Sequence, residues 1–198
     1  MIEKKDVIAF FDERAGDWDA GMVRSDEKIA RILDNARVRP GSRVLDVACG
    51  TGVLIADYLR RDVKSVTAVD ISPEMIRVAQ SKYPQKNVAF VCGDAETADL
   101  GADFDAIVIY NAFPHFPSPD TLIAHLASLL APGGRLTVAH GSSRAAIDAH
   151  HHGAASRVSN GLMEADALAA IFARHLRVTD VISTDEMYQV VGEKPAEE

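Results

Sequence analysis

The chain has 198 residues, of which 47% are hydrophobic and 25% are charged, and its formal net charge is -8. This length and composition suffice for one domain with a buried core, whereas the negative charge argues against a nucleic-acid backbone as a partner, because phosphate binding needs a basic patch. No apolar run reaches the roughly 20 residues of a membrane span, and the N-terminus is charged, without the apolar core of a signal peptide. We therefore expect a cytoplasmic protein that contacts neither nucleic acid nor a membrane.

The N-terminal region predicts helices, because apolar residues recur there at helical spacing along two faces. One face carries Val7, Phe11, Ala15 and Trp18, and the other carries Ile29, Ile32, Leu33 and Ala36. Residues 1–37 therefore form a helical segment ahead of the main pattern.

Between residues 43 and 140, short β-rich runs alternate with helical segments. The expected strands are Arg43–Ala48, Ser65–Asp70, Val88–Cys92, Phe104–Tyr110 and Arg135–His140. The expected helices are Val53–Arg61, Pro73–Tyr83 and Pro119–Leu130, the second with Ser72 as its N-cap and the third stopped by Pro132-Gly133-Gly134. Most strand runs are continuously apolar, which is typical of a sheet covered on both faces, and the alternation predicts right-handed crossovers and a parallel sheet.

The C-terminal region changes this rhythm. A helix over Glu164–His175 is followed by two strand-like runs, Leu176–Ile182 and Met187–Glu193. The residues between these runs are too few for a crossover helix, so the two strands must form an antiparallel hairpin on an otherwise parallel sheet. Cys49 and Cys92 each lie in or just after a strand-like run, and we expect both to be buried free thiols.

A glycine-rich loop follows the first expected strand. Gly50 and Gly52 stand two residues apart between a strand and a helix, where the backbone turns sharply and lets a ligand approach closely. A dinucleotide fingerprint wants glycine or alanine where this chain has Ile55, and the Gly-Lys-Ser/Thr of a P-loop does not follow. The loop therefore favours a ligand that needs close backbone approach without two phosphates.

Acidic residues end the next two strands. Asp70 lies roughly twenty residues past the glycines, where a carboxylate accepts both hydroxyls of a ribose. Asp94 closes the third strand and can receive an adenine amino group, with Ile71 and Met75 placed to cover the base. Each signal is weak alone, since such acids also cap strands and helices, but the set predicts an adenosine pocket across the carboxyl ends of three strands.

The chain contains, in order, the segments VLDVACGTG, VTAVDISPEMI, VAFVCGDAE, FDAIVIYNAFPHF and LLAPGGRL. Together they resemble the class I S-adenosylmethionine-dependent methyltransferases, and FFDERAGDWD resembles the N-terminal lid of that family. The resemblance implies an α/β, Rossmann-like fold with helices on both faces of a seven-stranded, mostly parallel sheet, in the order 3-2-1-4-5-7-6 with strand 7 antiparallel. It also implies one methyltransferase domain over residues 1–198, with a lid over 1–37 and a core over 38–194.

By this resemblance the co-substrate S-adenosylmethionine lies across the first three strand ends. Asp46 and the backbone of Ala48–Gly52 hold its methionine end, Asp70 its ribose, and Asp94 with Ala95 its adenine. The full set of implied cofactor-binding residues is Trp18, Asp46, Ala48, Gly50, Thr51, Gly52, Asp70, Ile71, Met75, Asp94, Ala95 and Asn111. Ala48 stands where many family members have glycine, and alanine is a common variant there.

The implied reaction is transfer of a methyl group to a small-molecule acceptor by in-line displacement, in which alignment of the nucleophile matters most. Catalytic candidates come from the loops after the fourth and fifth strands, namely His115 and His140. His115, His140 and His151 could instead hold zinc or another divalent metal, or be ordinary surface and core histidines. Arg144 and Arg157 lie in the same region and could meet an anionic acceptor or stand at the surface.

Two other functions stay open from the sequence alone. A nicotinamide-dependent oxidoreductase shares the doubly wound topology, although Ile55 and the terminal hairpin count against it. A non-catalytic protein that binds a cofactor or a metal could keep the same pocket. Only Gly141 to Met163 separates the fifth strand from the last helix, so we expect little cover over the acceptor, and either a monomer with a small acceptor or a homodimer that completes the wall.

Overall fold

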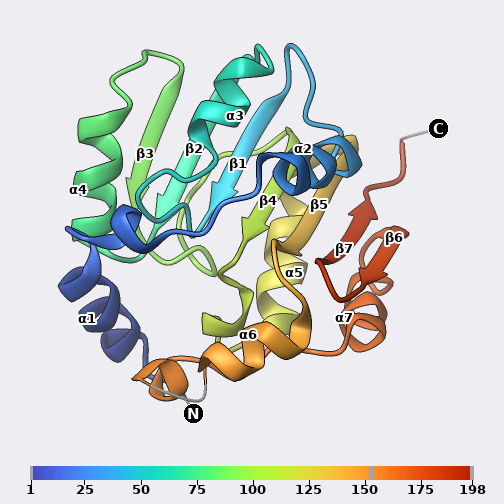
Figure 1. The fold of residues 1–198 in the computed structure, drawn as a ribbon. Coiled ribbons are helices and arrows are strands. Elements are labelled where there is room, and N and C mark those ends of the chain that lie inside the picture. The colour runs from blue at the N-terminus through green and yellow to red at the C-terminus, as the bar shows by residue number, and fades with distance from the viewer. Residues whose placement is uncertain (1, 152–153, 197–198) are drawn as a thin grey trace.

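The computed structural model describes residues 2–151 and 154–196, and its seven-stranded sheet has the order β3-β2-β1-β4-β5-β7-β6 (Figure 1). The strands are β1 (Arg43–Val47), β2 (Ser65–Asp70), β3 (Val88–Cys92), β4 (Phe104–Tyr110), β5 (Leu130–His140), β6 (Arg177–Ser183) and β7 (Tyr188–Glu193). β7 is antiparallel to both β5 and β6, and the other neighbouring strands pair in parallel. The expected strand order and the antiparallel hairpin are confirmed.

Helices pack on both faces of this sheet (Figure 1). They are α1 (Lys4–Arg14), α2 (Asp26–Asn35), α3 (Ile55–Arg60), α4 (Pro73–Lys82), α5 (Pro119–Ser128), α6 (Arg144–His151) and α7 (Ala165–Phe172), with short 3-10 helices η1 (Trp18–Gly21), η2 (Phe113–His115) and η3 (Ala154–Arg157). One core cluster joins the sheet to α2, α3 and α4, and another joins it to α5 and α7. In the parallel part of the sheet, the carboxyl end of each strand is therefore followed by a loop.

The central strands are buried on both faces, which explains their continuous apolar sequences. In β4, Ala106 and Val108 belong to the cluster with α2 and α3, whereas Ile107 and Ile109 belong to the cluster with α5 and α7. All four side chains are fully buried. Successive residues of a strand point to opposite faces, so a strand covered on both sides needs apolar residues at every position.

The start of α4 follows the expected capping pattern. Ser72 accepts a hydrogen bond from the backbone N–H of Met75 through its hydroxyl (3.1 Å), and Pro73 occupies the first turn. The cap satisfies one of the donors that a helix leaves open at its N-terminus. Because α4 begins directly after β2, this cap fixes the chain where β2 ends.

The Pro132-Gly133-Gly134 segment lies inside β5 and does not stop a helix as expected. α5 ends at Ser128, and β5 begins at Leu130. The register between β4 and β5 shifts between Phe104 and Ala106, beside this segment. A Cβ at Gly134 would lie 2.6 Å from the Phe104 carbonyl oxygen, so glycine is needed for the close approach of the two strands.

The two cysteines differ in exposure, which corrects the expectation that both are buried. Cys49 is buried and free, whereas Cys92 is free but exposed. Cys92 ends β3, which is the edge strand of the sheet and is only partly covered along its length. Within the residues described, no helix is both long and apolar enough to cross a membrane.

Candidate active site

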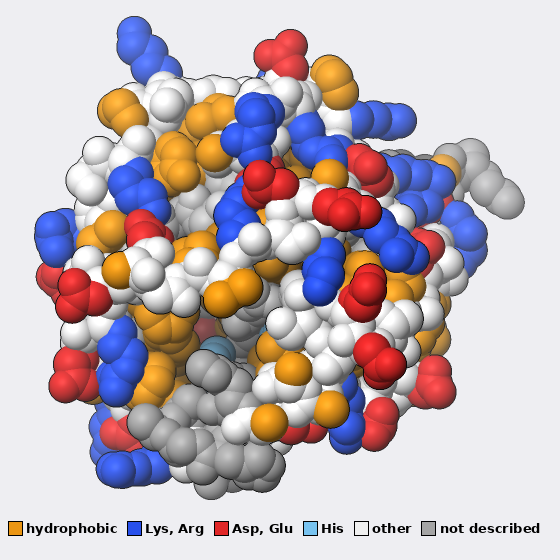
Figure 2. All heavy atoms as spheres, viewed as in Figure 1, with side chains coloured by type: hydrophobic (Ala, Val, Ile, Leu, Met, Phe, Trp, Pro, Cys, Tyr) orange, Lys and Arg blue, Asp and Glu red, His pale blue; other side chains and the backbone are white. Residues whose placement is uncertain are grey.

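The loops that carry the expected cofactor residues meet at one edge of the sheet. Val47 is in register with Val69 of β2 and with Ile109 of β4, and Asp70 is in register with Cys92 of β3. These strands are parallel, so the loops that follow them lie at the same edge, which is the lower edge in Figure 1. Figure 2 shows a hollow in the molecular surface there, with a histidine side chain visible inside it.

The loop after β1 has the left-handed backbone that close approach of a ligand requires. Ala48, Gly50 and Gly52 have φ values of 54°, 54° and 84°. A Cβ at Gly52 would lie 2.8 Å from Cε2 of Tyr83 and 2.9 Å from Cδ1 of Ile55, so only glycine fits there. Ala48 takes the same region with a side chain, which costs roughly 1–3 kcal/mol when the surrounding structure imposes it.

Asp70 holds this loop and the start of α4 together. Its Oδ2 accepts a hydrogen bond from the N–H of Gly50 (2.8 Å), and its Oδ1 accepts one from the N–H of Ser72 (2.9 Å). Burial raises the pKa of Asp70, and these hydrogen bonds act in the opposite direction. A carboxylate oxygen can accept a second hydrogen bond, so both oxygens keep capacity for the hydroxyls of a ribose.

Asp46 is a buried acid next to the glycine loop, on β1. Its Oδ2 and the hydroxyl of Tyr58 make no hydrogen bond of ordinary geometry to any residue described here. Burial raises the pKa of Asp46 to about 8; the nearby Tyr58 hydroxyl lowers it, while Asp70 and Asp57 raise it further. An orphaned polar atom in this place is what a ligand with a hydrogen-bond donor would satisfy.

The N-terminal segment lies across the cofactor loops, and we name residues 4–24 the strap. Asp19 accepts a hydrogen bond from the Thr51 hydroxyl (2.6 Å) and pairs with Lys82 (2.7 Å). Asp12 accepts hydrogen bonds from the Ser72 hydroxyl (2.5 Å) and from the N–H of Glu74 (3.2 Å). The strap thus contacts the loops after β1 and β2.

Both ends of the strap are fixed by ion pairs. Lys4 pairs with Asp94 and with Glu96 just after β3. Arg24 donates to both carboxylate oxygens of Asp57 on α3 (2.7 Å each) and to the carbonyl of Val53 (2.8 Å). The sequence reasoning missed these contacts because they join residues far apart in the chain. The only signal was the charge of Lys4, Asp12, Asp19 and Arg24 in an amphipathic segment.

The loop after β4 carries His115, at the end of η2. Its Nδ1 lies 2.6 Å from the carbonyl oxygen of Val158, and its ring packs edge-to-face against Phe11 of the strap (5.0 Å between centroids). Phe11 also packs against Trp18, at 5.4 Å. The strap therefore contacts the loop after β4 as well as the loops after β1 and β2.

The ends of β4 and β5 are tied together beside His140. Asn111, with φ of 54°, accepts a hydrogen bond from the N–H of Gly141 (3.0 Å). His140 is 1% exposed, and its ring lies edge-to-face with Tyr188 of β7 (5.9 Å). Burial raises the pKa of Tyr188, whose hydroxyl has no hydrogen-bond partner in the described part of the chain. His140 is thus a core residue at the strand end.

The other expected cofactor residues lie around the same loops. Met75 is 1% exposed, and its sulfur lies 4.0 Å from the Cβ position of Gly50. Ala95 is buried after β3, whereas Ile71 is half-buried after β2. The role of each of these residues in binding a ligand stays a prediction.

The three-histidine metal site also stays a prediction. The side chain of His151 lies outside the described residues. Among the side chains in residues 2–149 and 156–196, no three His, Cys, Asp or Glu residues are grouped as a metal would require. His115 is held by the Val158 carbonyl, and His140 by its position in the core.

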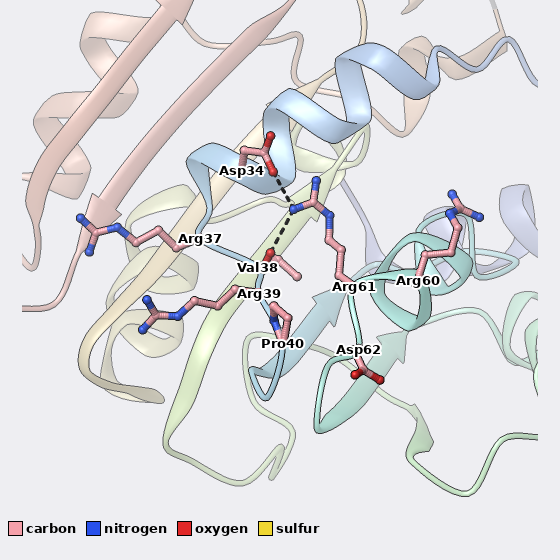
Figure 3. A pocket seen from close by; sticks show the side chains of 8 residues that line it. All are labelled: Asp34, Arg37, Val38, Arg39, Pro40, Arg60, Arg61 and Asp62. Atoms are coloured by element: carbon pink, nitrogen blue, oxygen red, sulfur yellow. Dashed lines mark hydrogen bonds and ion pairs between the residues drawn. The ribbon is translucent and has the colours of Figure 1, made fainter.

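A second concave region lies at the opposite end of the sheet and is not part of this site. It has a volume of about 400 Å³ and is bordered by the turns before β1 and after α3 (Figure 3). Arg61 bonds there to Asp34 (2.6 Å) and to the Val38 carbonyl (3.0 Å). The guanidinium groups of Arg39 and Arg60 point apart in Figure 3, so they form no convergent anion site.

Comparisons with known proteins agree with this geometry. Residues 44–134 match the family model of a methyltransferase domain. The chain is 38% identical over 107 residues to a ubiquinone biosynthesis O-methyltransferase of Xanthomonas axonopodis, which covers 52% of this chain and 44% of that protein. It is 34% identical over 141 residues to a malonyl-[acyl-carrier protein] O-methyltransferase of Acetivibrio thermocellus, and this alignment covers 69% of this chain and 49% of that protein. The chain spans about half the length of the curated relatives it matches.

Solved structures share the fold at low sequence identity. A chain from the complex of the Haloferax volcanii Trm112 methyltransferase activator with a methyltransferase superposes with a TM-score of 0.76 at 21% identity, covering 93% of this chain and 97% of that one. The N-methyltransferase NodS of Bradyrhizobium japonicum, in complex with S-adenosyl-L-homocysteine, superposes with a TM-score of 0.67 at 18% identity, covering 85% of this chain and 86% of that one.

The sheet order, the glycine loop backed by Asp70 and these matches define the fold as that of the class I S-adenosylmethionine-dependent methyltransferases. Residues 44–134, which match the model of a methyltransferase domain, contain the glycine loop, Asp70 and Asp94.

Proposed function

We propose that the protein transfers the methyl group of S-adenosylmethionine to a small-molecule acceptor. The observation that carries the proposal is the edge formed by β1, β2 and β3, where Asp70 fastens a glycine loop in which Gly50 and Gly52 both have positive φ. A nicotinamide-dependent dehydrogenase is disfavoured, because the described sheet has the hairpin and the strand order of the methyltransferase fold. The family match over this edge supports the same proposal.

The residues at this edge suit the parts of such a co-substrate. The backbone of Ala48–Gly52 and the orphaned Oδ2 of Asp46 suit the methionine end, which carries an ammonium group. Asp70 suits the ribose hydroxyls, and Asp94 with Ala95 suits the adenine. The co-substrate supplies an electrophilic methyl carbon on a sulfonium, and the protein residues bind and orient it.

His115 is the residue we assign as general base. The Val158 carbonyl can only accept a hydrogen bond, so Nδ1 carries the proton in a neutral ring, and Nε2 is then the nitrogen that accepts one. An acceptor hydroxyl that gives its proton to Nε2 forms its new bond to the methyl carbon while the carbon–sulfur bond breaks and its electron pair stays on sulfur. Alignment of these atoms supplies most of the rate, of order 7–11 kcal/mol in well-oriented systems.

The strap is the part we assign as a lid, within residues 1–37. It contacts the loops after β1, β2 and β3 through Asp19, Asp12 and Lys4. A bound co-substrate would lie beneath it and be shielded from water, which strengthens the electrostatic contacts of the site. We predict that the protein is either a monomer or a homodimer, and gel filtration tests this.

Two measurements test the function. Calorimetry should show that S-adenosyl-L-homocysteine binds, and label from S-adenosylmethionine should pass to a member of a panel of phenols, amines and thiols. His115→Gln should lower turnover far more than it lowers affinity for S-adenosyl-L-homocysteine, whereas the exposed control His175→Gln should change neither. Binding without transfer to any acceptor would indicate a non-catalytic protein, and absence of binding would refute the proposal.

A further inference from the structure

Three aromatic rings form a chain from the strap to the residue assigned as base. Trp18 of η1 packs edge-to-face against Phe11 of α1, with 5.4 Å between the ring centroids and 68° between the planes. Phe11 in turn packs edge-to-face against the imidazole ring of His115, at 5.0 Å and 86°. Aromatic pairs favour this arrangement, so the chain of rings holds the imidazole plane at a defined angle.

A second contact of the His115 ring also depends on the N-terminal segment. Its Nδ1 lies 2.6 Å from the carbonyl oxygen of Val158, a residue that is 3% exposed. Val158 is buried in a small apolar cluster with Ile2 and Val7, and Phe11 packs against the same cluster. The position of the carbonyl that meets Nδ1 is therefore set by apolar residues in and just before α1.

The same part of the strap is fastened to the loops at the carboxyl edge of the sheet. Asp12 of α1 accepts a hydrogen bond from the Ser72 hydroxyl (2.5 Å), and Asp19 of η1 accepts one from the Thr51 hydroxyl (2.6 Å). Each of these acids directly follows one of the two aromatic residues of the strap in the sequence. The contacts that hold α1 beside α4 at the lower left of Figure 1 thus also hold the rings that reach the base.

We infer that Phe11 is a positioning residue for His115, and that it holds the imidazole ring with Nδ1 on the Val158 carbonyl. This inference rests on the proposed function, because it names the residue that orients the base of that reaction. A neutral imidazole exists as two tautomers, and the carbonyl selects the one with its proton on Nδ1, which leaves Nε2 as the accepting nitrogen. Without the Phe11 ring the imidazole is free to turn away from the carbonyl, and in the other tautomer Nε2 carries the proton and no longer accepts one.

Phe10 provides a matched control on the same helix. Both phenylalanine rings are half-buried and pack against the same apolar cluster. Phe10 packs against Phe11 (5.2 Å between centroids) and beneath the guanidinium group of Arg14, whose carbon lies 3.8 Å from the ring centroid. A loss of apolar packing would therefore affect Phe10→Ala and Phe11→Ala alike, whereas Phe11→Ala also removes the ring that packs against His115.

Nitrogen NMR of the imidazole rings tests the inference on the protein alone, without any acceptor. Spectra are recorded at about pH 8.5, where an ordinary histidine is neutral, and His115→Gln identifies the signals of this ring by their loss. We expect the form with a proton on Nδ1 in the unsubstituted protein and in Phe10→Ala, and a mixture of both tautomers in Phe11→Ala. Phe11→Leu keeps apolar volume and should show a smaller share of the second tautomer, and it decides the test if Phe11→Ala does not fold.

Three results of this experiment would overturn the inference. They are an unchanged His115 pattern in both Phe11 variants, equal changes in Phe10→Ala and Phe11→Ala, and a proton on Nε2 in the unsubstituted protein. The second of these would show that the strap only packs against the base and does not orient it.

Turnover provides a second readout, with the phenol, amine or thiol of the panel that is methylated. Phe11→Ala should lower kcat at least about tenfold, because misplacing a catalytic group by about 1 Å can cost about a hundredfold. Its affinity for S-adenosyl-L-homocysteine should fall far less than kcat, and Phe10→Ala should change neither. If His115→Gln lowers kcat and Phe11→Ala does not, the inference is overturned; if His115→Gln leaves kcat unchanged, the base assignment fails and the inference falls with it. Absence of S-adenosyl-L-homocysteine binding removes the proposed function, whereas the NMR patterns still decide whether Phe11 orients the ring.

Discussion

Asp46 should make the protein less stable as the pH rises from about 4 to 8. Burial raises the pKa of Asp46 to about 8 in the folded protein, whereas an aspartate in an unfolded chain titrates near pH 3.9. Between these values the folded state holds a proton on Asp46 that the unfolded state has lost. The unfolded state then binds fewer protons, so the free energy of unfolding must fall as the pH rises, by about 1.4 kcal/mol per pH unit for this group.

The substitution Asp46→Asn isolates this effect, because asparagine has the same shape and does not titrate. Over two pH units below 8 the linkage amounts to about 2 to 3 kcal/mol. The free energy of unfolding of Asp46→Asn, taken relative to the unsubstituted protein, should therefore rise by that amount between about pH 5.5 and pH 7.5. Burial also raises the pKa values of Cys49 and Tyr58 next to Asp46, so both stay protonated over this range.

Urea unfolding at the two pH values measures the difference directly. The control is Asp103→Asn, at an exposed residue with φ of 59°, a region that asparagine tolerates as well as aspartate does. The control should show the same offset at both pH values. A pH-independent offset for Asp46→Asn, constant to within about 0.5 kcal/mol, would show that Asp46 is ionised in the folded protein and would refute the reasoning.

Three other substitutions probe the cofactor edge. Asp70→Asn keeps one of the two backbone hydrogen bonds and should weaken binding of S-adenosyl-L-homocysteine by about ten- to a hundredfold in calorimetry, since a hydrogen bond to a charged group is worth about 1.5–3 kcal/mol. Unchanged affinity would place the ribose elsewhere. Gly52→Ala should lower the free energy of unfolding by about 1–3 kcal/mol more than Gly41→Ala, because both glycines have φ near +80° but only Gly52 is crowded, and equal losses in urea unfolding would contradict this. Lys4→Met removes the cation shared by two carboxylates and should speed cleavage of α1 by chymotrypsin, whereas the exposed Lys5→Met should not, and equal cleavage rates would show that the ion pairs do not hold the strap.

The sheet could be predicted from the sequence because the signals that define it are local. Each strand is a short apolar run, and the gap lengths alone distinguish a helical crossover from a hairpin, as between β6 and β7. Pro132-Gly133-Gly134 was misinterpreted because proline and glycine mark both the end of a helix and an irregular strand. The exposure of Cys92 was misjudged because its apolar strand proved to be an edge strand, and strand order is not a local property.

The candidate site was located from the sequence only in part. The spacing between the glycines and Asp70 placed that carboxylate beside the loop, since both follow parallel strands that are neighbours. Its hydrogen bonds to Gly50 and Ser72 depend on side-chain geometry that spacing does not define. The contacts of Lys4 with Asp94 and Glu96 join residues about ninety positions apart, and charge alone does not choose such partners.

Positive φ at residues other than glycine occurs at both edges of the sheet, but at the carboxyl edge it directly follows buried strands. Five residues other than glycine have positive φ in the described chain. Arg37, Asp62 and Asp103 are exposed and lie in turns that lead into strands from the opposite edge, where strain is easily relieved. Ala48 and Asn111 instead follow the buried strands β1 and β4 directly, and the buried carboxyl of Asp46, whose pKa is raised by burial, lies two residues before Ala48. Strain and a buried acid on adjacent strand ends cost stability that apolar residues would restore, so their coincidence beside the hollow is best explained by a ligand that the chain is shaped to hold.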